Sequence, residues 1–169
     1  MIGTGVFTTT RYDSRRDFDE QRPSGVHVAR NHFTAAGVRW MWEMMAGRLR
    51  QDDGTLSDHL GSARIVVGNG DIGYVPNQER LQGDQTAQAP LDGGFPTTEV
   101  RLLEDDDFLR PLGLITFRAT FGEADACFDW REQGVVTAQG VLIDRAVGDG
   151  GRKVLGSVWQ TEAVLELTG

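Results

Sequence analysis

The most conspicuous motif with chemical potential is Gly68-Asn69-Gly70-Asp71-Ile72-Gly73, which matches the GxGxxG pattern and follows a predicted strand. In dinucleotide-binding proteins the last glycine of this pattern opens a helix whose N-terminus receives the pyrophosphate. Here Tyr74-Val75-Pro76 follows directly, and a proline at that point opposes a helix. No second parallel strand with a ribose-binding acid is predicted either. We therefore expect no nucleotide or other cofactor.

Metal-ligating residue types are present, but their spacing does not suit a metal ion. The acidic run at 104–107 has four consecutive carboxylates, whereas calcium loops alternate ligands with spacers and use glycine for the sharp turn. His27, His32 and His59 have no zinc-ligand spacing among themselves or with the single Cys127. We expect no metal site, and we interpret the acidic run as a solvated turn or an electrostatic docking patch.

The residue types needed for catalysis do not form a recognisable set. Ser57-Asp58-His59 places a nucleophile, an acid and a base side by side, but no serine lies in a GxSxG turn. An acid-rich segment contains a possible carboxylate pair for glycoside hydrolysis, whose separation a sequence does not measure. Our hypothesis is that the protein is not an enzyme. The four acids of that segment are Glu123, Asp125, Asp129 and Glu132.

The composition is typical of a single soluble domain. The chain has 169 residues, of which 39% are hydrophobic, enough for one core without a disulfide or metal staple. A single cysteine excludes a disulfide framework, and neither a leader pattern nor a run of about 18 apolar residues is present. The formal net charge of −8 argues against non-specific nucleic-acid binding. We expect neither a nucleic-acid partner nor a membrane partner.

The first 30 residues differ from the rest of the chain. Their apolar residues are scattered, so neither helical nor strand periodicity persists for more than a few positions, and Pro23-Ser24-Gly25 indicates a turn. We interpret residues 1–30 as an extended N-terminal arm that is ordered, if at all, by lying on another surface. A frayed tail is the alternative. Residues 31–169 then form a single β-rich domain.

One N-terminal amphipathic helix is predicted, over about residues 34–47. Thr34 is a suitable N-cap. Val38, Met41, Trp42 and Met45 recur at i, i+3, i+4 and i+7, which places an apolar stripe on one face. All four tryptophans are assigned to the core: Trp40, Trp42, Trp130 and Trp159.

From residue 63 onward the pattern changes to short strands separated by turns. Residues 114–121 alternate between apolar and polar side chains, the period of a strand with one buried face. Several strands at close spacing without intervening helices favour a mainly β protein, an antiparallel β-sandwich or barrel. Between the strands, a loop is predicted over about residues 68–98, and a loop of that length is usually functional or packed against a neighbour. Turns are predicted at Gly134, Gly140 and the run 148–151.

Two pairs of segments, taken in order, resemble a known family. Asn31–Gly47 followed by Ala63–Gly70 matches a helix that leads into a strand and a glycine turn. Ile115–Phe121 running into Cys127–Val135 is similar to a block found in phage tail-fibre attachment domains and related minor virion proteins. Glu132 and the following turn glycine match best, whereas Cys127 stands where the family often has asparagine. The resemblance to small bacteriophage virion proteins spans about residues 31–167.

The resemblance implies a virion structural protein that acts by protein–protein binding. It would decorate and cement the capsid as a minor capsid protein, or serve as a tail-associated component, with the major capsid protein or tail proteins as partners. Such proteins commonly form closed rings, which implies a homo-oligomer, a trimer favoured, located in the virion after assembly in the host cytoplasm. The alternative is a receptor- or glycan-binding module of a tail fibre, with Tyr74 or exposed tryptophans stacking on sugar rings.

Contacts with neighbouring subunits are expected in the arm and in the long loop. Of the 17 basic residues only Lys153 is a lysine, and arginine tolerates burial in protein interfaces better than lysine does. The arm is close to neutral while the remaining chain is strongly acidic, so the arm meets little repulsion on a neighbouring subunit. The expected subunit or lattice contacts are Phe7, Arg11, Tyr12, Arg15, Arg16, Phe18, Tyr74, Pro76 and Phe95.

Overall fold

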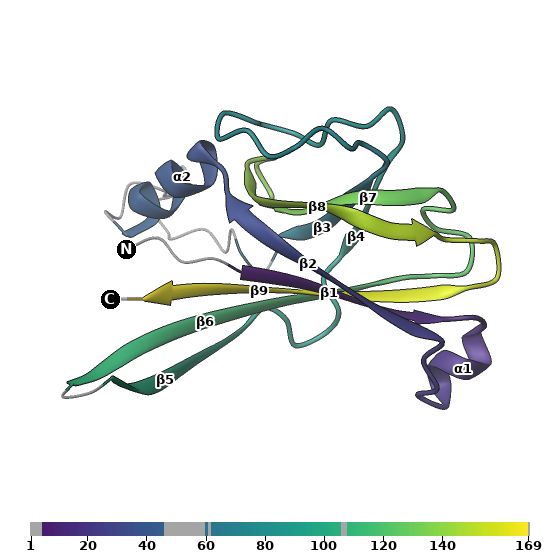
Figure 1. Ribbon diagram of the computed structural model, residues 1–169, viewed down its shortest axis with the longest axis horizontal. Coiled ribbons are helices and arrows are strands. Elements are labelled where there is room, and N and C mark those ends of the chain that lie inside the picture. The colour runs from purple at the N-terminus through teal and green to yellow at the C-terminus, as the bar shows by residue number, and fades with distance from the viewer. Residues whose placement is uncertain (1–4, 46–59, 61, 106–107, 169) are drawn as a thin grey trace, which may run out of the picture.

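A computed structural model describes residues 5–45, 60, 62–105 and 108–168 of the chain. This part of the chain holds nine strands and two helices (Figure 1). In chain order they are β1 (Gly5–Tyr12), α1 (Arg15–Asp19), β2 (Gly25–Phe33), α2 (Ala35–Met45), β3 (Arg64–Gly68), β4 (Thr86–Pro90), β5 (Thr97–Asp105), β6 (Phe108–Phe121), β7 (Asp129–Val136), β8 (Leu142–Arg152) and β9 (Val158–Thr168).

All nine strands belong to one antiparallel sheet with the order β4-β3-β7-β8-β2-β1-β9-β6-β5. The sheet curls, so that β3 and β4 at one end come into contact with β6 near the other end. The hydrophobic core fills the inside of this half-barrel. The predicted mainly β, antiparallel architecture is therefore confirmed, as a single curled sheet.

The alternation predicted over residues 114–121 is confirmed in β6 from Thr116 onward, whereas at its start Leu114 is buried and Ile115 is partly exposed. Phe117, Ala119 and Phe121 are buried on the inner face, and the residues between them are partly exposed. In the register of the sheet, Ala163 of β9 lies between Phe117 of β6 and Phe7 of β1. Since a small residue between two large ones lets neighbouring strands share the interior, this row is part of the tightly packed core.

The expectation of an extended arm over residues 1–30 is not confirmed. β1 pairs with both β2 and β9, in the middle of the sheet. Its inward residues include Thr9, which is fully buried and bonds at 3.0 Å to Gln133 of β7, across the interior, and at 3.0 Å to Thr161 of the neighbouring strand β9. The strand has no hydrophobic alternation because some of its inward positions are polar and are satisfied by distant partners.

The predicted helix is present as α2, and Thr34 is its N-cap. The amide of Gly37 donates to Thr34 Oγ1 at 2.9 Å. The predicted apolar stripe is not confirmed: the buried residues of the helix are Gly37 and Trp40, and the side chains of residues 42–45 lie outside the described part. A Cβ on Gly37 would lie 2.0 Å from the carbonyl oxygen of Ile143, so the glycine lets α2 approach β8.

The long loop predicted over residues 68–98 is shorter in the structure. It is divided by β4 and ends where β5 begins, which leaves loop 69–85 and a short connection over 91–96. Two of the predicted turns are also wrong: Gly134 lies within β7 and the run 148–151 lies within β8. At Gly134 the absence of a Cβ permits close approach, since an added one would lie 2.7 Å from the carbonyl oxygen of Asp144.

Candidate functional site

Loop 69–85 lies on the outer face of the sheet over a buried ion pair. Glu132 of β7 and Arg145 of β8 both have side chains with 0% exposure, and Arg145 Nη2 lies 2.7 Å from Glu132 Oε2. Arg145 Nε donates to the same oxygen at 2.8 Å. Gly134 stands opposite Arg145 in the register, diagonal to Glu132, so no side chain separates the two charges.

The carboxylate of Glu132 is bound by the backbone of the loop. The amides of Gln82 and Gly83 donate to Oε1 at 2.9 and 2.7 Å, and the amide of Gly70 donates to it at 3.2 Å. Backbone amides that converge on a buried anion satisfy it as a preformed cradle does. Glu132 therefore joins the two ends of loop 69–85 to the sheet.

The guanidinium group of Arg145 binds the middle of the same loop. Its Nη2 donates to the carbonyl oxygen of Ile72 at 2.9 Å, and its Nη1 donates to Gln78 Oε1 at 2.8 Å. Gln78 in turn accepts a hydrogen bond from the amide of Val75. Since each charge of the pair is satisfied by the other and by loop atoms, the backbone conformation of the loop is well determined.

The GxGxxG segment surrounds Glu132. A Cβ at Gly68 or Gly70 would lie 2.7 or 2.5 Å from Glu132 Oε1, so both positions require glycine. The motif thus provides space and an amide donor for the protein's own carboxylate. Glu132 is one of the four acids from which a catalytic pair is conceivable, but its carboxylate is enclosed by the loop.

The outer surface of loop 69–85 is partly apolar. Ile72 and Val75 have exposed fractions of 55% and 49%, and Pro76 beside them is exposed. Tyr74 is directed inward: its hydroxyl donates to the carbonyl oxygen of Phe33 at 2.6 Å, and its ring lies 4.9 Å from that of His32. Two of the predicted contact residues, Tyr74 and Pro76, thus lie on the same loop as Ile72 and Val75, which were not among the predicted contacts.

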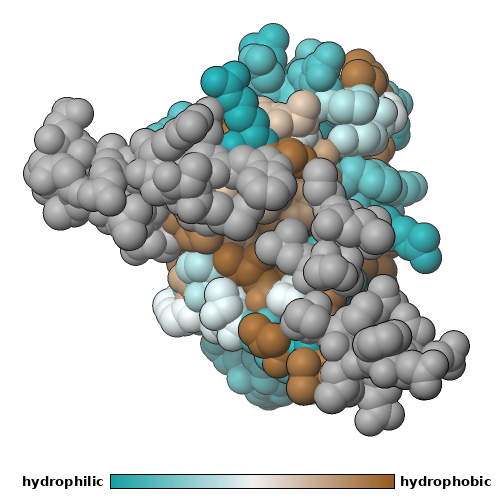
Figure 2. All heavy atoms as spheres, turned by 90° about the vertical axis from the view of Figure 1, so that its left-hand side faces the viewer, coloured by the Kyte–Doolittle hydropathy of each residue, from teal (hydrophilic) through white to brown (hydrophobic). Residues whose placement is uncertain are grey.

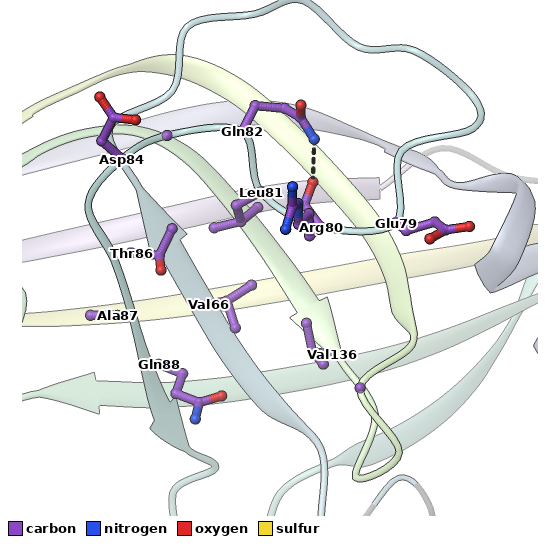
Figure 3. Close-up of a pocket in the computed structure, with 12 residues that line it drawn as sticks. Val66, Glu79, Arg80, Leu81, Gln82, Asp84, Thr86, Ala87, Gln88 and Val136 are labelled. Atoms are coloured by element: carbon purple, nitrogen blue, oxygen red, sulfur yellow. Dashed lines mark hydrogen bonds between the residues drawn. The ribbon is translucent and has the colours of Figure 1, made fainter.

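A hollow of about 720 Å³ lies between residues 79–84 of this loop and the strands β3 and β4. Figure 3 shows Val66, Thr86 and Gln88 projecting from these strands, with the loop passing over them. The side chain of Gln82 bonds back to the carbonyl oxygen of Arg80 at 2.8 Å. The rest of the lining is mixed: Glu79, Arg80 and Asp84 are charged, whereas Leu81, Ala87 and Val136 are apolar.

Four of the other predicted contact residues lie at or near α1, away from loop 69–85 (Figure 1). Arg15 and Arg16 are exposed and form ion pairs one helical turn along α1. Phe18 packs edge-on against Tyr12 at 5.1 Å. Arg11 donates to the carbonyl oxygen of Gly150 and lies over the ring of Trp159.

Of the last three predicted contact residues, two are buried and one is half-buried and lies apart from the others. Phe7 lies in the hydrophobic core and Tyr12 is covered by Phe18 of α1, with exposed fractions of 0% and 4%, so neither side chain is accessible on the described surface. Phe95 is half-buried under Arg118, whose guanidinium carbon lies 4.2 Å from the ring centre. The structure therefore does not join the predicted contacts into one surface.

Sequence reasoning missed Arg145 and the buried Asp144 beside it. Asp144 accepts hydrogen bonds from the amide of Val135 at 2.9 Å and from the side chain of Asn31, while burial raises its pKa to about 7. The sequence does contain a signal for these two residues, since they are adjacent charged residues that interrupt the apolar run 141–147. Charged side chains within such a run are rarely fully buried unless they are paired.

Comparison of the chain with protein-family models, with curated proteins and with solved structures finds no match. In the described part of the chain, no helix has the length and apolar character required to cross a bilayer.

Proposed function

We propose that this protein is a bacteriophage virion structural protein that acts by binding other proteins during assembly. It decorates or cements the capsid as a minor capsid protein, or is a tail-associated component, and it has no catalytic role. The observation that carries the proposal is the pair of exposed apolar residues, Ile72 and Val75, on a loop whose backbone is anchored by a buried ion pair. Exposed apolar residues on an ordered surface are typical of protein contacts.

The anchoring of loop 69–85 supports binding for an energetic reason. A loop that is already ordered loses little conformational entropy when a partner covers it, so more of the contact energy appears as affinity. On a symmetric particle many such contacts act together and raise the effective affinity. The proposed partners are the major capsid protein or tail proteins. The chain is also proposed to bind further copies of itself, with a trimer as the favoured oligomer. Neither nucleic acid nor a membrane is a proposed partner, and the proposed location is the virion.

The experiment is to replace both apolar residues of the loop and to follow incorporation into particles. In the double variant Ile72→Asp/Val75→Asp the contacts with Glu132 and Arg145 remain, because those contacts use backbone atoms of the loop. Particles would be purified from the infected host by density gradient, and the chain located in them by immunoblot and cryo-electron microscopy. We expect the double variant to fold and to be lost from the particles, while the unaltered chain is found on the head or the tail.

A matched control uses the turn between β8 and β9. Val154 and Leu155 are also exposed, with fractions of 55% and 78%, so Val154→Asp/Leu155→Asp changes the charge equally at another place. This variant is expected to be incorporated normally. Absence of the unaltered chain from purified particles would contradict the virion role. Normal incorporation of the loop variant would show that loop 69–85 is not the contact surface.

A receptor- or glycan-binding module is the second candidate, and the polar side chains in the hollow beside β4 favour it. Carboxylate and amide groups such as those of Glu79, Gln82 and Gln88 are suited to hydrogen bonds with sugar hydroxyls. Among the described residues, none that lines the hollow is aromatic, and the ring of Tyr74 is already in contact with that of His32. Binding of the purified chain to a panel of cell-envelope glycans, lost in Gln88→Ala, would support this candidate, whereas no binding at millimolar glycan would exclude it.

A further inference from the structure

β5 is an edge strand whose second side has no partner among the described strands. Residues 97–102 are all exposed, although they lie within a regular strand. Two of them are large apolar residues, Val100 and Leu102, with exposed fractions of 72% and 62%. A long exposed edge with apolar side chains is a template for pairing with another strand, and folded proteins usually protect such edges.

The hairpin of β5 and β6 also extends past its neighbour. Pairing of β6 with β9 begins at Leu112, so residues 108–111 of β6 pair only with β5 in the described part. Figure 1 shows this hairpin projecting at the end of the molecule where α2 and the C-terminus lie. Figure 2, which faces that end, shows apolar residues at its surface. Because residues 97–102 are exposed along the free edge of β5, this edge is accessible to a second molecule.

The charges of β5 select a partner strand. Glu99 and Arg101 lie on the same face of the strand, one on each side of Val100, and Arg101 Nε bonds to Glu99 Oε1 at 2.7 Å. Both side chains are more than half exposed, at 55% and 59%. A strand with an acid and a base placed symmetrically about a central residue is complementary to itself in the antiparallel direction, because reversal exchanges the two charges.

The register follows from symmetry. A two-fold axis perpendicular to the sheet keeps each face on its own side, so only residues of the same parity come opposite one another. An axis at Glu99 would bring two carboxylates together, and an axis at Arg101 would bring two guanidinium groups together. An axis at Val100 places each Glu99 opposite Arg101 of the second copy, and opposite charges directly across strands are stabilising whereas like charges are destabilising.

We propose that two copies of this chain associate through their β5 edges, antiparallel and about a two-fold axis at Val100. Val100 then faces Val100 of the second copy, and each Leu102 faces Thr98 of the second copy on the inner face. The four charges of Glu99 and Arg101 form a row on the other face. The contact makes one continuous sheet of the two molecules and covers the exposed edge of both.

Association would be measured on the purified full chain by sedimentation velocity over a range of concentrations. A contact confined mainly to one strand is small, so we expect a dissociation constant between about 10 µM and 1 mM. Val100→Lys places two ammonium groups at the axis and is expected to raise that constant at least about tenfold. The matched control is Leu155→Lys, at an exposed apolar position in the turn between β8 and β9, which should leave the dissociation constant unchanged.

A charge exchange tests the register itself. Glu99→Arg alone and Arg101→Glu alone each bring like charges opposite one another, so each variant is expected to dimerise more weakly than the unaltered chain. The double variant Glu99→Arg/Arg101→Glu restores opposite charges and should regain dimerisation. Mixing the two single variants should give mixed dimers above the statistical share, detected by native mass spectrometry.

Two results would overturn the inference. The first is an unaltered chain that remains monomeric at about 1 mM, and the second is an oligomer whose stability Val100→Lys does not change. Near-UV circular dichroism of each variant shows whether the fold is kept, and all the altered side chains are exposed. The inference is independent of the virion role, because it is measured on the purified chain, whereas the virion role is measured by incorporation into particles.

Discussion

At the scale of single residues, the buried charges are the main feature of this protein. The ion pair Glu132–Arg145 fixes loop 69–85, and the carboxyl group of Asp144 is held inside the half-barrel. The single lysine of the chain is also buried: Lys153 Nζ donates to the carbonyl oxygens of Gly122 and Ser157, at 2.7 and 2.8 Å. Burial lowers the pKa of this lysine. The ion pair and Lys153 connect loops to the sheet, whereas Asp144 of β8 bonds to Asn31 of β2 and Val135 of β7.

Glu132→Gln is expected to destabilise the protein strongly. It leaves the charge of Arg145 buried without its counterion, which typically costs about 3–5 kcal/mol. Urea denaturation measures the loss, and trypsin cleavage after the exposed Arg80 reports release of loop 69–85. The double variant Glu132→Gln/Arg145→Met should lose less than the sum of the two single variants. Additive losses would show that the two charges do not act as a pair.

Asp144 predicts a pH dependence of stability. The pKa of its carboxyl group is raised from 3.8 to about 7 by burial, so between these values the folded protein binds more protons than the unfolded chain. Stability contributed by the protonated form is therefore complete below about pH 4 and is lost as the pH rises to about 7, with a total on the order of 4 kcal/mol.

Asp144→Asn removes this titration. The new amide still accepts from the amide of Val135, and it can donate to Asn31 Oδ1, a buried oxygen without a hydrogen-bond partner in the described structure. We expect the variant to be more stable than the unaltered chain at pH 8 and equally stable at pH 4, measured by urea denaturation at several pH values. A difference between the two chains that is constant with pH would refute the role of Asp144.

At the scale of elements, the N-terminal strands are essential parts of the sheet. β1 lies between β2 and β9, and β2 joins β1 to β8. An extended arm would be removable, whereas these strands connect the two halves of the half-barrel. The short helix α1 between them is held by local contacts, among them the N-cap Ser14.

Deletion of residues 1–30 is accordingly expected to prevent folding. It removes β1 and most of β2, and it leaves Gln133 and Thr161 without their buried partner Thr9. Thermal unfolding followed by near-UV circular dichroism should show no cooperative transition. Arg15→Ala/Arg16→Ala, at exposed positions of the same segment, should change stability by no more than about 0.5 kcal/mol. A folded deletion variant would mean that the strands are dispensable.

At the scale of the whole molecule, one curled sheet supports two accessible surfaces on different elements. Loop 69–85 is anchored over the outer face of β7 and β8, and the β5 edge is at the end of the strand order. The net charge of −8 keeps separate molecules apart unless a contact is specific in shape or charge. The proposed dimer has such specificity because Glu99 and Arg101 pair only in one register.

The sequence by itself determined the β-rich class, the alternation in β6 and the cap of α2. These features depend on side chains close in the chain, for which periodicity and local hydrogen bonds are sufficient. Only the tertiary structure decided the central place of β1, the burial of Glu132 with Arg145 and the exposure of the β5 edge. Thr9 is satisfied by residues 124 and 152 positions away, so its inward direction is invisible to any local pattern. A buried polar residue is stable only when its partners are present, and those partners come together only when the sheet has formed.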